Sequence, residues 1–310
     1  MGGGVTVLAG ASGKLGGHLV RALLERGARV RALVRRGGAP ARLAPLHALG
    51  VEVVEADFED AAALTRACAG GACVVSALSG VRVVIVDAQT ALLDAAVAAG
   101  VPRFVPSDYC IDYTTLPRGH NRNLDLRAEF GERLDAAPIR ATSVLNGMFT
   151  ELLVGPAPVV LFPLRRVVYW GDADQPLDFT TIDDTATFTA AAALDPSTPR
   201  FLRVAGEVVS ARGLARAASE ATGTRFRLLR AGGLGRLERL IALARTIAPG
   251  RDEPVPPWQG MQYLRDMFGG RAKLAPLDNA RYRELRWTTV REVLAAHAAA
   301  LPGDAERAAA

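Results

Sequence analysis

The chain has 310 residues, a length that suits one large domain or two ordinary ones. Half of the residues are hydrophobic and 22% are charged, as is usual for a globular protein with a sizeable core. The net charge is +5, but the basic residues are spread along the chain, and aromatic residues make up only 6%. We therefore expect no nucleic-acid partner, since no basic stripe carries interleaved aromatic residues.

No apolar run reaches the length of a membrane span, and no signal peptide precedes the first structured segment. These features predict a cytoplasmic protein without a membrane partner. Cys68, Cys73 and Cys110 are too few and wrongly spaced for a disulfide framework or a zinc site, so no metal is expected. We expect a monomer or a homodimer that acts on a small molecule.

Residues 5–36 read as strand, glycine turn, helix and strand. Val5 to Ala9 is a short apolar run typical of a buried strand, and residues 30–34 form a second. Between them, glycines at positions 10, 13 and 16 precede a helical pattern of apolar residues that Gly27 ends. This order predicts the first βαβ unit of a doubly wound, parallel Rossmann sheet, an α/β fold that binds dinucleotides.

The glycines suit a pyrophosphate, which must approach backbone N–H groups at the start of a helix. A Cβ at Gly10 or Gly13 would obstruct the turn or that approach, and Gly16 lets the helix pack close to the strand. A glycine turn without a ligand is the alternative. The residues expected at the pyrophosphate are Gly10, Ser12, Gly13, Lys14, Leu15 and Gly16.

Arg35 and Arg36 stand at the end of the second strand, where folds that select NAD place an acidic residue. A guanidinium can hold the 2′-phosphate of the phosphorylated cofactor with charge-assisted hydrogen bonds, whereas an acid would repel it. The pair therefore predicts NADP(H) as the cofactor; two solvated arginines are the alternative.

The next two strands are expected at residues 51–56 and 72–77. Asp57 and Phe58 follow the first of them and would flank the adenine, although Asp57 could instead cap the helix expected at 61–69. Ala77 and Leu78 open a small-residue loop at the carboxyl end of the sheet, where ligands of such folds bind. A largely apolar helix is expected at 87–99.

A fifth strand is expected at 101–106 and leads to Ser107, and a sixth is expected at 140–145. The segment after the sixth strand holds Asn146 and Phe149. The asparagine could orient the carboxamide of the nicotinamide and the phenylalanine could shield one face of that ring, which makes both residues, with Ser107, candidates for the cofactor site. The alternative is the start of a helix, because asparagine is a good N-cap.

Five sequence features, taken in order, resemble the NmrA-like and isoflavone-reductase-like branch of the atypical short-chain dehydrogenases. They are the Gly-Ala-Ser-Gly-Lys-Leu-Gly turn, Arg35, the Val-Pro-Ser-Asp-Tyr segment at 105–109, Asn-Gly-Met-Phe at 146–149, and Gly171-Asp172 followed by Asp178-Phe179 and Asp183-Asp184. The resemblance covers residues 5–230. It implies hydride transfer from NADPH to a conjugated or aromatic-ring-linked substrate.

The resemblance also implies a lysine on the helix after the Pro-Ser-Asp-Tyr segment, but Arg127 occupies that position. Arginine stays protonated near neutral pH, so we expect Arg127 to clamp the ribose or a substrate oxyanion rather than deliver a proton. A surface ion pair is its alternative role. The proton would then come from Tyr109, Tyr113, His120 or water. Tyr109 and His120 are therefore the further catalytic candidates, although Tyr109 could be a pocket wall and His120 a solvated loop residue.

From residue 153 the composition changes, with prolines between short apolar runs. We expect a Rossmann domain over 1–155 and a smaller α+β substrate domain over 156–310, with 178–195 returning to the Rossmann core. Asp183 and Asp184 are read as helix-start residues, not as a catalytic pair. Later helices are expected at 210–222, 234–247, 258–268 and 287–300.

Together these features predict an NADPH-dependent reductase of a small enone, ketone or quinone-like compound. Two alternatives remain open: an NADP(H)-binding regulator without turnover, which the missing lysine fits, and a redox-neutral isomerase or dehydratase that retains NADP.

Overall fold

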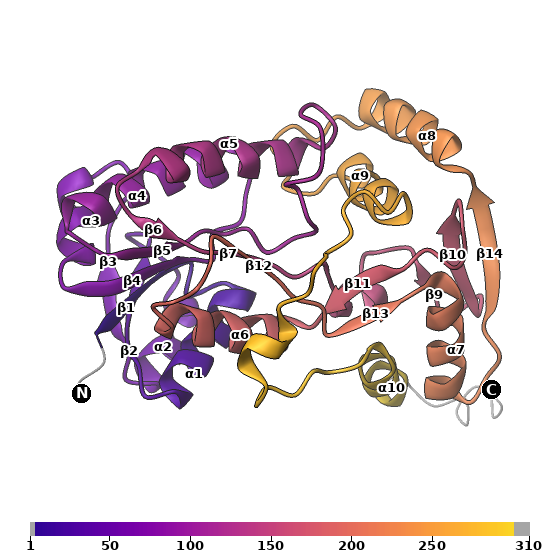
Figure 1. Cartoon of the computed structure of the whole chain (residues 1–310), viewed down its shortest axis with the longest axis horizontal. Coiled ribbons are helices and arrows are strands. Elements are labelled where there is room, and N and C mark those ends of the chain that lie inside the picture. Colours follow the sequence, from indigo (N-terminus) through magenta and orange to yellow (C-terminus); the bar gives the residue numbers. More distant parts are fainter. Residues whose placement is uncertain (1–3, 301–310) are drawn as a thin grey trace.

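The computed structural model describes residues 4–300 and contains a six-stranded parallel sheet (Figure 1). The strands are β1 (Val5–Ala9), β2 (Arg29–Val34), β3 (Glu52–Glu55), β4 (Gly71–Ser76), β5 (Arg103–Val105) and β6 (Arg140–Ala141). Their order in the sheet is β3-β2-β1-β4-β5-β6, so the direction of winding reverses between β1 and β4. This is the doubly wound Rossmann arrangement that the sequence predicts.

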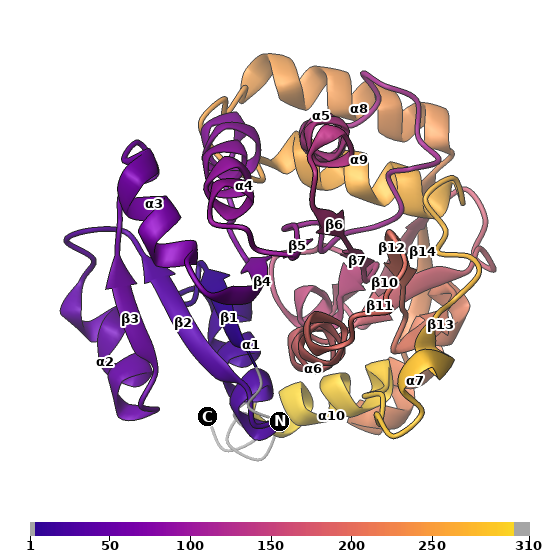
Figure 2. The ribbon, with the colours of Figure 1, turned by 60° about the vertical axis from the view of Figure 1, so that its left-hand side comes forward.

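Helices cover both faces of this sheet (Figure 2). One layer holds α1 (Lys14–Glu25), α2 (Pro40–Ala48) and α6 (Ile182–Leu194); the other holds α3 (Ala61–Cys68), α4 (Gln89–Ala98) and α5 (Arg122–Ala136). Successive side chains of β1 point to opposite layers, Leu8 into the cluster of Leu19 and Val7 into that of Leu92. Because β1 is buried on both faces, its sequence is an almost continuous apolar run.

The rest of the chain forms small sheets and helices beside the carboxyl ends of the large sheet. The small sheets are β14-β10-β9, β13-β11-β8 and β12-β7. Their strands are β7 (Ser143–Leu145), β8 (Met148–Phe149), β9 (Val160–Leu161), β10 (Arg166–Trp170), β11 (Leu177–Thr180), β12 (Phe201–Arg203), β13 (Glu207–Val209) and β14 (Arg227–Gly232). The helices are α7 (Ala211–Thr222), α8 (Leu234–Ile247), α9 (Pro257–Phe268) and α10 (Val290–Ala300). One cluster of buried side chains, which includes Phe179, Leu214 and Met267, joins most of these elements.

The sixth strand expected at 140–145 is two strands, because the backbone changes its partner in the middle. The N–H of Thr142 donates to Phe104 of β5, whereas the N–H of Ser143 donates to Arg200 just before β12. Consequently β6 belongs to the large sheet and β7 to a separate pair.

Two expected helix starts are wrong by several residues. The helix expected from 87 begins at Val83 with a π-helical segment, Val83–Ala88, that leads directly into α4. The helix expected from 287 begins at Val290, where Thr289 and Glu292 form a capping box: the Glu292 carboxylate accepts from the Thr289 N–H, and the Thr289 hydroxyl accepts from the Glu292 N–H.

Helix α7 has the predicted ends. The Ser210 hydroxyl accepts from the N–H of Gly213, and Gly223 ends the helix with a φ of 66°. The first turn of α6 also holds Asp183 and Asp184 as expected, with Thr181 as the cap. The Asp184 carboxylate accepts from the Thr288 N–H at 2.8 Å, and the Asp183 carboxylate lies 2.9 Å from Nδ1 of His18 in α1. The two acids therefore serve different contacts, which supports the structural interpretation.

Asp195 ties the end of α6 to the 3₁₀ turn Asn279–Tyr282. Its carboxylate accepts hydrogen bonds from Ser197, Arg281 and Tyr282, with distances of 2.7–2.9 Å for the three side chains. Partial burial alone would raise the pKa of this carboxyl, but the hydrogen bonds outweigh it and lower the pKa well below its usual range. The ionised form is therefore stabilised by folding.

We predict that Asp195→Asn lowers the free energy of unfolding by about 1 kcal/mol at pH 7, since the charged acceptor is partly screened by solvent. A lowered native pKa gives stability that is present above the unfolded-state pKa, about 4, and is lost as pH falls through the native value. The free energies of unfolding of the wild-type protein and Asp195→Asn, measured by urea denaturation, should thus become more similar below pH 4. An equal difference at pH 7 and pH 3 would contradict this assignment.

Candidate functional site: a cleft at the carboxyl ends of the strands

The residues assigned to the cofactor follow neighbouring strands of the large sheet. The turn at 10–16 follows β1, Arg35 and Arg36 follow β2, and Asp57 follows β3. Leu78 follows β4 and Ser107 follows β5. All of these strands are parallel, so these segments lie along a single edge of the sheet, beside the reversal between β1 and β4.

Steric limits within the turn after β1 explain its glycines. Gly10 has a φ of 82°, and a Cβ there would lie 2.6 Å from the carbonyl oxygen of Ala77. A Cβ on Gly16 would overlap the carbonyl group of Gly10, whereas one on Gly13 would meet only the Gly10 oxygen, at 3.2 Å. Gly10 and Gly16 thus let β1, β4 and α1 approach one another.

Helix α1 begins with free backbone donors. Its N-cap is Gly13, which has no side chain to satisfy the first N–H groups, and Ser12, Gly13 and Lys14 are exposed. Leu15 is half-buried against the sheet. A helix start with unpaired donors attracts an anion, so this turn fits the pyrophosphate of a dinucleotide.

Arg35 and Arg36 are both exposed beyond β2. Nε of Arg36 lies 3.8 Å from the Asp57 carboxylate, and Asp57 and Phe58 are half-buried beside it. Asp60, not Asp57, caps α3, since its carboxylate accepts from the Ala63 N–H at 2.9 Å. Asp57 therefore does not cap α3, which was the alternative role expected for it.

The loops after β4 and β5 are fastened to each other. The Ser107 hydroxyl donates to the carbonyl oxygen of Leu78 at 2.6 Å, and the Ser107 N–H donates to the side chain of Gln89 at 2.9 Å. Ser107 is buried, while Ala77 and Leu78 are half-buried. These two hydrogen bonds hold the loop after β4 at the centre of the carboxyl edge of the large sheet.

The segment after β7 does not start a helix at Asn146. It turns at Gly147, with a φ of 71°, into the short strand β8, which ends at Phe149. The N–H groups of Asn146 and Gly147 both donate to the carbonyl oxygen of Cys110, and the Asn146 amide donates to Thr185 at 3.2 Å. The buried Oδ1 of Asn146 has no hydrogen-bond partner among the described residues, so it is an acceptor that suits the carboxamide of a nicotinamide.

Arg127 lies on α5 and is half-buried. Its Nη1 donates to the carbonyl oxygen of Asn123 at 3.1 Å, and its buried Nε has no partner within the described part of the chain. Burial disfavours the charge of Arg127, but the acidic groups of Tyr263, Cys110 and Asp108 outweigh that effect and raise its pKa. Arg127 is thus a permanent cation.

The structure does not bring the other two catalytic candidates to Arg127. Tyr109 is 7% exposed and packs beside Phe188 of α6, in the helix layer opposite α5, and burial raises the pKa of its phenol. His120 lies with Nε2 3.1 Å from the carboxylate of Asp266 on α9. His120 is therefore held by a carboxylate, whereas the buried hydroxyl of Tyr109 has no hydrogen-bond partner among the described residues.

Two further groups near the site escaped the sequence interpretation. The buried Asp108 carboxylate accepts from the Tyr113 hydroxyl at 2.8 Å and from the Ser143 hydroxyl at 2.6 Å. The ammonium of Lys273 bonds the carboxylate of Asp178, whose backbone packs on Gly147. Asp108 directly follows Ser107 in sequence and could have been suspected, but the partners of Lys273 are fixed only by the tertiary fold.

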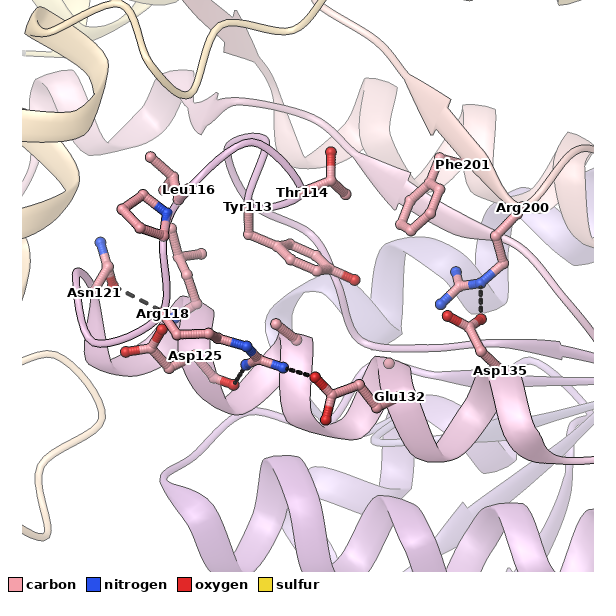
Figure 3. Close-up of a pocket in the computed structure, with 14 residues that line it drawn as sticks. Tyr113, Thr114, Leu116, Arg118, Asn121, Asp125, Glu132, Asp135, Arg200 and Phe201 are labelled. Atoms are coloured by element: carbon pink, nitrogen blue, oxygen red, sulfur yellow. Dashed lines mark hydrogen bonds and ion pairs between the residues drawn. The ribbon is translucent and has the colours of Figure 1, made fainter.

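A cavity of about 210 Å³ lies beside this network, between α5, residues 113–121 and β12 (Figure 3). Its two arginines are both neutralised: Arg118 pairs with Glu132, and Arg200 pairs with Asp135 at 2.5 Å. Its walls include none of the residues assigned to the cofactor. Among residues 4–300, no helix has the length and apolar character needed to cross a bilayer, and no cluster of three His, Cys, Asp or Glu residues suits a metal ion.

Comparison with known proteins shows the family. The model of the NmrA-like family matches residues 3–284. Among curated proteins, an isoflavone reductase homolog of Zea mays is 33% identical over 205 residues, and pinoresinol reductase 1 of Arabidopsis thaliana is 32% identical over 207. These alignments cover 61% and 62% of the chain, and they span only 64% and 65% of the two relatives.

Solved structures share the fold over nearly the whole chain. AtPrR2 with NADP+ and (+)pinoresinol matches with a TM-score of 0.82 at 22% identity, over 95% of this chain and 99% of that one. An isoflavone reductase matches with 0.78 at 20% identity, over 94% and 98%. The quinone oxidoreductase QOR2 from Escherichia coli, complexed with NADPH, matches with 0.71 at 21% identity, over 94% and 99%.

Alanine substitutions at two glycines of the turn should have different effects. Gly13→Ala should leave the protein folded, because the added Cβ meets one atom at 3.2 Å, but should weaken dinucleotide binding. Gly16→Ala should instead lower the thermal midpoint by several degrees, because its Cβ overlaps the Gly10 backbone. Thermal unfolding and calorimetric titration with NADPH would separate the two effects. A Gly16→Ala protein with unchanged stability would contradict the close approach of α1.

Proposed function

The chain belongs to the NmrA-like family, and on that premise we propose that it is an NADPH-dependent reductase of a small enone, ketone or quinone-like substrate. The observation that carries the proposal is the single edge that holds the glycine turn and the arginine pair, with the Asn146 loop bonded to Cys110 just beyond β5 of the same sheet. Each of these three segments suits a different part of one dinucleotide.

The proposed cofactor orientation follows from the strand order. The pyrophosphate would lie on the start of α1, and the adenine ribose would extend toward Arg35 and Arg36 after β2. The nicotinamide would lie toward the loops after β4, β5 and β7, with the Asn146 carbonyl as acceptor for its amide. Bound NADPH would supply the hydride.

Arg127 would act as an electrostatic clamp near the reacting end of that cofactor. Its guanidinium keeps its charge near neutral pH, so it can hold an oxyanion but cannot donate a proton. Tyr109 and His120 remain proposed proton sources. Tyr109 belongs to a cluster that also contains Leu15 and Phe149, both assigned to the cofactor, whereas His120 is held by Asp266.

The direct test is steady-state NADPH oxidation by the pure protein with a panel of quinones, enones and ketones. Turnover of any member would support the reductase. Tight NADPH binding without turnover, together with a protein partner recovered in pull-down, would favour the NADP(H)-binding regulator instead. Interconversion of a substrate without net NADPH oxidation would favour the redox-neutral enzyme.

The cofactor preference gives a separate prediction. Arg35→Asp should weaken NADPH binding by about a hundredfold, since it replaces a cation at the 2′-phosphate by an anion, and should change NADH binding by less than about threefold. Calorimetric titration with both nucleotides measures this, and Arg29→Asp at the exposed start of β2 is a matched control. An equal loss for both nucleotides would remove Arg35 from the phosphate site.

A further inference from the structure

Arg127 has no carboxylate partner in the described part of the chain and little hydrogen bonding to make up for it. The buried Arg103 also lacks an acid there, but its guanidinium donates to the carbonyl oxygens of Ala192 and Ala193 and to the hydroxyl of Thr198. Among residues 4–300, Arg200 pairs with Asp135, Arg203 with Asp112 and Arg265 with Asp266, but no ion pair reaches Arg127. Its protein hydrogen bond goes to a carbonyl oxygen of its own helix, and its Nε is buried without an acceptor. A desolvated cation of this kind is costly unless an anion joins it.

Asp108 is the carboxylate that affects the pKa of Arg127, but it does not supply that anion. Asp108 acts on Arg127 only through space, and its carboxylate is already bonded to Tyr113 and Ser143. Burial is the largest influence on Asp108 and raises its pKa, so its negative charge is itself disfavoured. The other neighbours of Arg127 that affect its charge are Tyr263, Cys110 and Tyr113. Burial raises the pKa of the Cys110 thiol to about 12 and raises the pKa of both phenols, so all three groups are neutral at pH 7.

Part of the Arg127 side chain is open to solvent. It is half-buried on α5, and its charge acts through space on the thiol of Cys110, whose carbonyl oxygen anchors the loop of Asn146. The arginines of the cavity in Figure 3 offer a contrast, because Arg118 and Arg200 are each paired with an acid. An incoming anion would meet an unpaired charge at Arg127 and a neutralised one in that cavity.

We propose that the substrate is an anion at neutral pH: a ketone, enone or quinone-like compound that carries a carboxylate, which Arg127 binds in the ground state. This inference rests on the proposed reductase function and names its substrate class. The planar guanidinium can donate two parallel hydrogen bonds to the two carboxylate oxygens, a geometry that a lysine at this position could not offer.

The carboxylate takes no part in the redox change. The electron-poor carbon gains a hydride, NADPH becomes NADP+, and one proton from solvent completes the reduced product. The anionic group stays bound to Arg127 throughout and positions the carbon that is reduced.

A matched pair of compounds tests the proposal: 3-benzoylacrylate and its methyl ester. The ester is the more electrophilic of the two, so reactivity alone would favour it. We expect kcat/KM to be at least tenfold higher for the acid. Turnover of the ester as fast as the acid would overturn the inference while leaving the reductase function intact.

Binding gives a readout that does not depend on turnover. The saturated analogues, 4-oxo-4-phenylbutanoate and its methyl ester, are titrated calorimetrically into protein loaded with NADP+. The acid should bind about ten- to a hundredfold more tightly, as a charge-assisted pair of hydrogen bonds implies. Equal affinity would overturn the inference whether or not the protein turns over any substrate.

Three variants assign the effect to Arg127. Arg127→Gln should abolish the preference for the acid in both measurements, and Arg127→Lys should restore part of it. Arg133→Gln, on an exposed part of the same helix, should leave the preference unchanged. If Arg127→Gln instead weakens NADPH binding tenfold and spares the acid preference, Arg127 serves the cofactor and the inference is wrong.

Discussion

The close approach of α1 to β1 and β4 is the constraint on which the cleft depends. Only glycine fits at positions 10 and 16, because a side chain there would collide with the backbone of Ala77 or of Gly10. That approach brings the uncapped start of α1 to the reversal point of the sheet, where its N–H groups face outward.

The second half of the chain completes the cleft through contacts with the first half. Helix α6 packs on α1, and its Thr185 accepts from the amide of Asn146. The carbonyl oxygen of Cys110, just beyond β5, accepts two backbone hydrogen bonds from the same loop. The nicotinamide end of the proposed site is therefore built by segments far apart in sequence, whereas the pyrophosphate end is built within twelve residues.

This difference explains how far the sequence could predict the structure. The glycine turn and the caps of α7 depend on neighbouring residues, and the structure confirms them. The change of partner at Thr142 and Ser143 depends on where β12 lies, and the pairing of His120 with Asp266 depends on where α9 lies. Neither of these two contacts produces a recognisable pattern in the neighbouring sequence. The missing lysine at position 127 was visible in the sequence, but the absence of an acid beside Arg127 needed the fold.

The bond between Lys273 and Asp178 has a practical consequence. The chain has only two lysines, and the ammonium of Lys273 is occupied by a buried carboxylate. Lys14, by contrast, is exposed at the mouth of the glycine turn. An amine-reactive fluorophore would therefore attach, beyond the chain's amino terminus, mainly next to the cleft, which makes this arginine-rich protein unusually simple to label at its own binding site.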